Sequence, residues 1–214
     1  MKVQSRRSIF LPVLVVGAPL VLAIVELFHP QPHDLMHLDT RIWLMVHYLQ
    51  IPLFPLAALS VCMLLRGRSG FLPGLVWASM FVFAVSFTAF DTAAGVVTGI
   101  LVKEAQSTGM FEAWQQPIMT VWRHRIVGGA PGTSPLLAVM GSVAWSVGLV
   151  GVAVGVWRTQ RSWILVLLLI VSAFGLSLFK THAWPGGPIS FGALGMAAMW
   201  LERKRLREPV ASTL

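Results

Sequence analysis

The sequence predicts an all-α integral membrane protein, a bundle of six transmembrane helices with both termini in the cytoplasm. Its composition is 56% hydrophobic and only 11% charged, with a mean hydropathy of +0.76, whereas soluble domains carry roughly 25% charged residues. Apolar runs recur along the chain at the length of a bilayer-crossing helix, which takes roughly 20 residues. Lys and Arg gather at alternate ends of these runs, which predicts the orientation.

Six apolar runs are the predicted spans, at residues 9–28, 42–65, 71–102, 135–157, 162–179 and 187–201. The first follows a basic start, as a secretory signal does. It is long for the apolar core of a signal, however, and it ends without a small-residue cleavage site, so we expect a retained helix. In the second span, Pro52 and Pro55 remove two amide donors, which predicts a locally broken helix there.

Orientation follows from the cations that flank the spans. One side carries Lys2, Arg6, Arg7, Arg66, Arg68, Arg158, Arg161, Arg203, Lys204, Arg205 and Arg207. The other side carries Arg41, Lys103, Arg123, Arg125 and Lys180, spread over longer loops. Because short cytoplasmic loops hold the excess of Lys and Arg, the first side is predicted to be cytoplasmic. We expect a multi-pass protein of a cell membrane, of the bacterial inner-membrane type.

The one long loop covers residues 103–134, on the outer side between spans three and four. Apolar residues recur in it at helical spacing, namely Met110, Phe111, Trp114, Ile118, Val121 and Trp122. This pattern predicts an amphipathic helix that lies in the membrane interface and is kinked at Pro117. It would serve as a surface anchor or as a lid over the outer helix ends.

A single polytopic membrane domain is predicted for residues 1–201, followed by a basic cytoplasmic tail at 202–214. The net charge of +8 and the pI near 11.1 would suit a nucleic-acid partner. Membrane topology accounts for the positions of these cations, however, so no nucleic acid is expected. The tail is expected to meet anionic lipid headgroups. The one cysteine, Cys62, argues against a disulfide within the chain and against a thiolate metal cluster.

Histidines supply the main functional clue. All six fall in the outer flanks or the outer part of a span, at His29, His33, His37, His47, His124 and His182. One face of the third span is polar or small, and it carries Thr88, Asp91, Thr92, Gly95, Thr98 and Gly99. Such residues pack helices closely, but a carboxylate in the bilayer costs on the order of 3 kcal/mol or more. Asp91 is therefore expected to face a cavity, a cation or a partner.

The second span offers a partner for Asp91, because His47 and Gln50 lie three residues apart on one helical face. The outer loop before it contains His33 and His37, whose i, i+4 spacing lets two imidazoles reach one metal ion. In that loop Asp34 or Asp39 could be a third ligand or could orient an imidazole N–H.

Glu26 and His29 close the first span and could contribute to the same site, and His182 ends the fifth span at the same level. The predicted metal ligands are His33, His37, His47 and His182. Asp91 or Glu26 is expected to act as a further ligand or as general base. The predicted substrate-binding residues are Gln50, Thr88, Thr92 and Trp184.

In its chemistry this combination resembles the membrane hydrolases of the alkaline ceramidase and progestin-receptor superfamily. Those proteins combine histidines, an aspartate and a serine around zinc within a helical bundle. They have seven spans and a histidine spacing near the last helix, both of which this chain lacks. The resemblance is one of chemistry, not of descent.

Four functions are compatible with the sequence, and the preferred one is a metal-dependent membrane enzyme of the hydrolase type. Zinc is the expected ion, and a lipid-like or small amphiphilic substrate would enter from the outer leaflet. The second is a b-type haem protein for electron transfer, with His47 and His182 as the axial pair. The third is a proton-coupled permease or sensor, in which Asp91 and His47 exchange protons.

The fourth is an accessory subunit that packs against another membrane protein or a second copy of the chain. Small residues on two helix faces would form such contacts, namely Gly151, Ala153 and Gly155 in span four and Gly192 and Gly195 in span six. This function would account for the glycines but not for Asp91.

Overall fold

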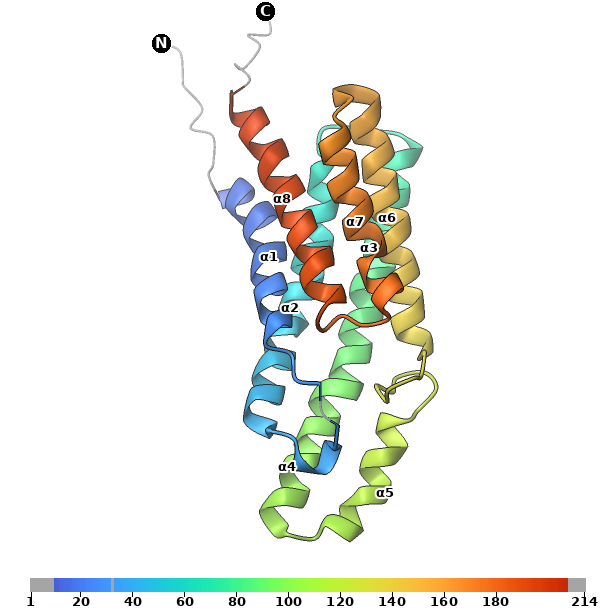
Figure 1. Cartoon of the computed structure of the whole chain (residues 1–214). Coiled ribbons are helices and arrows are strands. Elements are labelled where there is room, and N and C mark those ends of the chain that lie inside the picture. Colours follow the sequence, from blue (N-terminus) through green and yellow to red (C-terminus); the bar gives the residue numbers. More distant parts are fainter. Residues whose placement is uncertain (1–9, 32, 208–214) are drawn as a thin grey trace, which may run out of the picture.

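Helices are the regular elements of the computed structural model, which describes residues 10–31 and 33–207 (Figure 1). Their bounds are α1 Phe10–Leu27, η1 Leu35–His37, α2 Thr40–Leu64, α3 Phe71–Phe90, η2 Asp91–Val97, α4 Thr98–Thr108, α5 Phe111–Trp122, α6 Leu136–Gln160, α7 Trp163–Phe179 and α8 Gly186–Arg207. η1 is a 3-10 turn and η2 is a π-helical segment. The all-α prediction is confirmed.

Four helical segments are long and apolar enough to cross a membrane, at Phe10–Leu27, Thr40–Leu64, Phe71–Thr108 and Leu136–Gln160. The third of these comprises α3, η2 and α4 in one continuous rod, and α7 is a shorter apolar helix. Large apolar side chains lie on the outside of the bundle, with Phe81 70% exposed and Leu178 74% exposed. Such surfaces are unfavourable in water but suit lipid tails. The chain is therefore a membrane protein.

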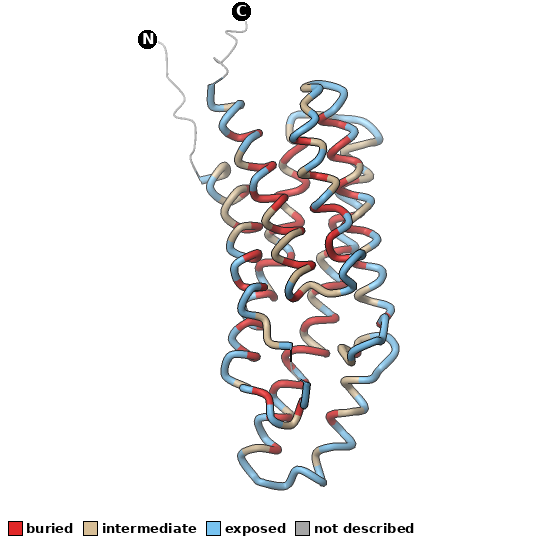
Figure 2. Tube along the Cα trace, in the orientation of Figure 1, coloured by how far each residue is buried: buried red, intermediate tan, exposed pale blue. Residues whose placement is uncertain are grey.

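The helices pack side by side, with α2 between α1 and α3, α6 against α3 and α7, and α8 against α1 and α7. Their buried faces turn toward one another (Figure 2). At the centre the rings of Phe54, Phe83, Trp145 and Phe191 form a chain of contacts with centroids 4.5 to 6.0 Å apart. Because lipid tails are as apolar as these rings, close van der Waals packing rather than exclusion of water holds them together.

The small-residue faces are used within the chain. Gly151 and Gly155 of α6 lie against side chains of α3 and of the α2–α3 connection, and Gly195 of α8 lies against Leu20 of α1. Only Gly192 of this set has open space beside it. Close approach of the helices inside the bundle therefore explains most of these glycines.

One end of the bundle is basic, and we call it the basic end. It holds the α2–α3 and α6–α7 connections, the beginning of α1 and the end of α8 (Figure 1). Arg66 forms a bidentate salt bridge of 2.7 Å with Glu202, which also accepts from Arg205 at 2.8 Å. Arg205 in turn donates to the carbonyl oxygen of Leu64 at 2.6 Å, in the last turn of α2. These bonds join α2 to α8 and satisfy a helix end.

At the opposite end α4 and α5 form a hairpin that extends beyond the other helices (Figure 1). Gly109 makes the turn with a φ of +69°, a conformation that favours glycine. Ile118 of α5 is fully buried and packs in one cluster with Val102 and Ala105 of α4. The amphipathic helix predicted in this loop is present. It packs antiparallel to α4 rather than lying flat across the end of the bundle, because its apolar face is covered by α4.

One other expectation differs from the structure. α2 is one continuous α-helix through Pro52 and Pro55, so the predicted local break is wrong; each proline removes a single donor, and the packed helix tolerates this. Residues 202–207 of the expected basic tail lie in the last part of α8, and the cytoplasmic location of the tail stays a prediction. The expectations for Lys2, Arg6, Arg7 and residues 208–214 lie outside the described residues.

Candidate functional site

Ionisable side chains from five segments converge where α1 and α7 end and α8 begins, while α2 and the rod of α3, η2 and α4 continue past this level (Figure 1). The five residues are Glu26, His29, His47, Asp91 and His182, and we call them the histidine–carboxylate cluster. Glu26, Asp91 and His47 are 0%, 1% and 2% exposed. Buried ionisable groups of this kind need partners, since each is costly alone.

Glu26 lies in the last turn of α1, with its side chain directed into the bundle. The amide of Gln50 on α2 donates to its Oε1 at 2.8 Å, while Oε2 has no hydrogen-bond partner among the described residues. Gln50 thus orients the carboxylate and leaves one oxygen available. The structure brings these two predicted residues together.

His29 follows α1, where the chain leaves the helix. Its Nδ1–H donates to the carbonyl oxygen of Pro30 at 2.9 Å, so its unpartnered Nε2 carries the lone pair. Burial lowers the pKa of His29 to about 4. The ring is therefore neutral at pH 7, which is the state that binds a metal ion.

His47 projects from α2 into the same space. Its Nδ1–H donates to the carbonyl oxygen of Trp43 at 2.6 Å, one turn earlier, which leaves Nε2 as the free acceptor. Trp43 packs against this ring at a tilt of 34°, with centroids 4.3 Å apart. It donates its own Nε1–H to the carbonyl oxygen of Gly95 at 2.7 Å. A Cβ on Gly95 would overlap the imidazole of His47, so glycine is required for this approach.

Asp91 stands at the junction of α3 and the π-helical segment η2. Neither of its carboxylate oxygens has a hydrogen-bond partner among the described residues. Oδ1 lies 3.7 Å from Nε2 of His47 and 3.6 Å from Nε2 of His182, which is too long for a hydrogen bond. Two imidazole nitrogens therefore point at one carboxylate from opposite elements without bonding to it.

His182 lies in the short connection between α7 and α8. Its Nε2 is buried and unpartnered, and burial lowers its pKa well below the usual value. A Cβ on Gly187 would clash with the backbone of His182 and touch the side chain of Glu26. The glycine thus allows the first turn of α8 to close over the site.

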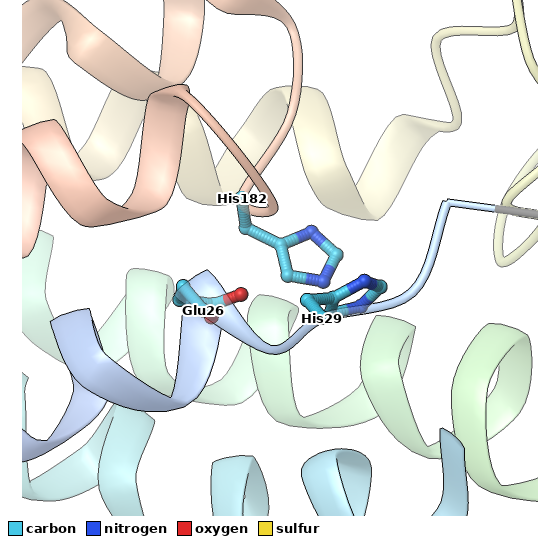
Figure 3. Close-up of side chains that lie close together, drawn as sticks. All are labelled: Glu26, His29 and His182. Atoms are coloured by element: carbon cyan, nitrogen blue, oxygen red, sulfur yellow. The ribbon is translucent and has the colours of Figure 1, made fainter. Parts of the chain in front are cut away.

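Three residues of this cluster lie close enough together that they could hold a metal ion. Ligand atoms of Glu26, His29 and His182 lie within 4.8 Å of one another, and the three side chains point toward one another (Figure 3). An ion with bonds of about 2.1 Å holds neighbouring ligand atoms roughly 3.0 to 3.4 Å apart. The limit of 4.8 Å is wider than this, so the three side chains would have to move closer together to hold an ion. Asp91 lies next to this group, with its Oδ1 3.6 Å from Nε2 of His182 and 3.7 Å from Nε2 of His47.

The charge of the cluster also suits a cation. Glu26 and Asp91 can carry two negative charges, and neither forms a salt bridge with a Lys or Arg of the described part of the chain. The three histidines contribute neutral ligands. One divalent ion would balance the two carboxylates, which matters in a medium of low dielectric constant.

Two predicted ligands lie elsewhere. His33 and His37 are exposed beside η1, and the Nδ1–H of His37 donates to Asp34 at 2.7 Å. That hydrogen bond lowers the pKa of Asp34. Asp39 caps α2 by accepting from the amides of Arg41 and Ile42. The structure does not bring this loop pair into the cluster.

The predicted substrate-binding residues surround the cluster unevenly. The Thr88 hydroxyl, one turn before Asp91, has no hydrogen-bond partner among the described residues. Thr92 is half-buried, next to Asp91 in η2. Trp184 is 57% exposed near His182, and its carbonyl oxygen accepts from Gln31 at 2.6 Å. Their roles stay predictions.

His29 was only a secondary candidate in the sequence, yet it lies at the centre of the cluster, with its ring centroid 4.8 Å from those of both His47 and His182. The signal was present in the sequence. Glu26 and His29 are three residues apart, the spacing of the Glu-x-x-His motif of bundle metal sites, and His29 lies just past the end of α1.

Comparisons of the chain with models of protein families, with curated proteins and with solved structures found no match.

Proposed function

We propose that the histidine–carboxylate cluster binds one divalent transition-metal ion and that the chain is a metal-dependent membrane enzyme. The observation that carries the proposal is the convergence of unpartnered, buried ligand atoms. Glu26 Oε2, His29 Nε2, both Asp91 oxygens and His182 Nε2 all lack partners among the described residues. Groups left in this state are costly unless a ligand satisfies them.

Zinc is the ion that we expect. Three imidazoles and two carboxylates form a nitrogen and oxygen set without thiolate, which suits zinc and also iron. Hydrogen bonds that orient the proposed ligands are present, from Nδ1–H of His47 to the Trp43 carbonyl oxygen and from the Gln50 amide to the Glu26 carboxylate. Such bonds fix the imidazole tautomer and the carboxylate orientation.

The proposed reaction is hydrolysis. Zinc held by the cluster would supply an acidified water as the nucleophile near pH 7. Glu26 or Asp91 would accept the proton of that water, and the other carboxylate would remain a ligand. The substrate would be lipid-like or a small amphiphile, with the Thr88 hydroxyl and Trp184 beside its path from the outer leaflet.

Proton exchange is the second candidate, because Asp91 and His47 lie 3.7 Å apart without a direct bond. A b-type haem between His47 and His182 is less well supported. The ring of His29 lies 4.8 Å from both of these rings and would have to leave.

We further propose six spans with the basic end in the cytoplasm, in a bacterial inner membrane. The cations at the basic end, among them Arg66 and Arg205, support this orientation through the positive-inside rule. α7 and α8 would be the fifth and sixth spans. Membrane lipids would be the partners, and a second copy of the chain or another membrane protein could pack on the exposed faces.

The test is the metal content of the detergent-purified protein, measured by mass spectrometry. We expect about one zinc ion per chain in the wild type and its loss in His182→Ala and Asp91→Asn, since each removes a ligand. His37→Ala is the matched control, because this exposed histidine lies outside the cluster and should leave the metal content unchanged. Equal metal in all variants would contradict the proposed site.

Hydrolysis is tested separately with ester-linked and amide-linked lipids. Release of fatty acid by the metal-loaded wild type, and its loss on chelation, would support the reaction. Metal binding without any release would leave the metal centre in place and overturn the hydrolase assignment. Proton uptake coupled to transport would then be the next assay.

A further inference from the structure

A groove of about 610 Å³ opens on the outside of the bundle, between α2 and α4. None of its lining residues belongs to the histidine–carboxylate cluster. Its wall is apolar and is formed by Leu44, Met45, Tyr48 and Leu49 of α2. Thr40, Arg41 and Lys103 line the end of the groove that is farther from the basic end. The hydrogen bond from Thr40 to Gln106 places this part of α4 at the level of the first turn of α2.

The two cations of the groove have no evident structural role. Arg41 and Lys103 are both exposed, and neither forms a salt bridge with a carboxylate of the described chain. The neighbouring Asp39 already accepts backbone amides as the cap of α2. The positive-inside rule accounts for the cations of the basic end but not for this pair.

We infer that the groove binds one anionic phospholipid. Two cations from different helices line one end of the groove, and an apolar wall continues from them along α2 toward the basic end. The proposed topology places these cations at the level of the outer headgroups. The planar guanidinium of Arg41 can donate two parallel hydrogen bonds to a phosphate, and Lys103 adds a compact charge beside it. The acyl chains would lie along Met45 and Leu49.

This site is independent of the proposed metal centre. Trp43, His47 and Gln50 face the interior from α2, whereas Met45, Tyr48 and Leu49 are about half-exposed on its other side. Lipid binding would hold α2 against α4 from the outside. Each cation at a membrane surface strengthens binding of anionic lipid roughly fivefold, so the pair predicts a preference of about 30-fold.

Native mass spectrometry of the purified full-length protein tests the inference, with equimolar phosphatidylglycerol and phosphatidylcholine that carry the same acyl chains. The wild type should retain phosphatidylglycerol about 30-fold better. Arg41→Gln combined with Lys103→Gln should abolish the preference, and Lys103→Gln alone should reduce it about fivefold. Arg123→Gln combined with Arg125→Gln removes two exposed cations outside the groove and should retain the preference.

A wild type without preference for phosphatidylglycerol, or a double groove variant that keeps the preference, would overturn the inference. The metal content of the same samples separates the two proposals. Groove variants should keep their metal, whereas absence of metal from every sample would contradict the metal centre and leave the lipid result standing.

Discussion

His47 illustrates how single residues set up the cluster. Its ring occupies space that any side chain on Gly95 would fill, it stacks on Trp43, and its Nδ1–H is bound by the backbone of α2. The carbonyl oxygen of Gly95 is itself bound by Trp43. Gly95 thus leaves room for the imidazole of His47, and its carbonyl oxygen accepts the hydrogen bond that holds Trp43 beside that imidazole.

Gly95→Ala should therefore disrupt metal binding, although Gly95 is not itself a proposed ligand. The added methyl group would overpack the site and lower the free energy of unfolding by about 1–3 kcal/mol. It would also displace the imidazole of His47, so the affinity for metal should fall strongly. Metal content and thermal unfolding measure the two effects.

Gly192→Ala is the matched control for that substitution. It also replaces a helical glycine, but nothing lies within 4 Å of the added methyl group. It should stabilise α8 by up to about 1 kcal/mol through helix propensity and leave the metal unchanged. Full metal binding by Gly95→Ala would contradict the described packing of His47.

At the scale of elements, the π-helical segment η2 is the irregular feature of the site. It begins at Asp91, and its seven residues replace α-helical geometry at the level where the cluster lies. π-Helical turns are rare and occur frequently at functional sites. Here η2 lets Asp91 and the Gly95 carbonyl both face α2.

Deleting Ala93 should convert η2 to regular α-helix. A π-helical turn holds about one residue more than an α-helical turn, so the deletion should keep α3 and α4 in nearly the same relative orientation while it tightens the backbone at Asp91 and shifts its carboxylate relative to the Gly95 carbonyl. We expect loss of metal with helical content unchanged by circular dichroism. A deletion variant that retains its metal would show that η2 does not position the ligands.

The sequence predicted the helices well because each span is a long apolar run with charged flanks. The bounds of α1, α2 and α6 lie within three residues of the predicted spans. The irregular segment was not predictable in the same way. Two prolines suggested a break in α2, whereas the actual irregularity is η2, whose residues resemble those of an ordinary packed helix.

The candidate site could be predicted in part. Asp91 was identified because its charge is unfavourable in a bilayer, and His47 because it shares a helical face with Gln50. The pair His33 and His37 had suitable spacing, but spacing within a loop does not establish whether the loop folds inward. Only the packing of α1 and the α7–α8 connection brings His29 to His182.

Across the whole molecule, the basic end and the histidine–carboxylate cluster differ in how their charged side chains are bonded. The basic end is joined by Glu202, which binds both Arg66 and Arg205, and these bonds hold α2 against α8. The ligand atoms of the cluster lie farther along the bundle and lack such partners. Salt bridges thus stabilise the basic end, whereas the buried carboxylates and imidazoles of the cluster are left without such bonds.

The proposed orientation predicts which cysteine variants react with a membrane-impermeant maleimide on intact cells. Ser107→Cys in the last turn of α4 should be labelled from outside, and Ser69→Cys in the α2–α3 connection only after permeabilisation, since the latter lies at the basic end. Both positions are exposed, and the native Cys62 is buried and should give little background. The reverse labelling pattern would contradict the orientation.

X-ray absorption at the metal edge of the purified protein tests the central claim most directly, because it reports the element and its nearest ligands together. The account predicts a zinc edge with nitrogen and oxygen neighbours at about 2.0–2.1 Å and outer scattering from imidazole rings. Iron with the same neighbours would change the metal but keep the site. Sulfur neighbours, or a metal content far below one ion per chain, would contradict the proposed centre. That centre is built from Glu26, His29, His47, Asp91 and His182.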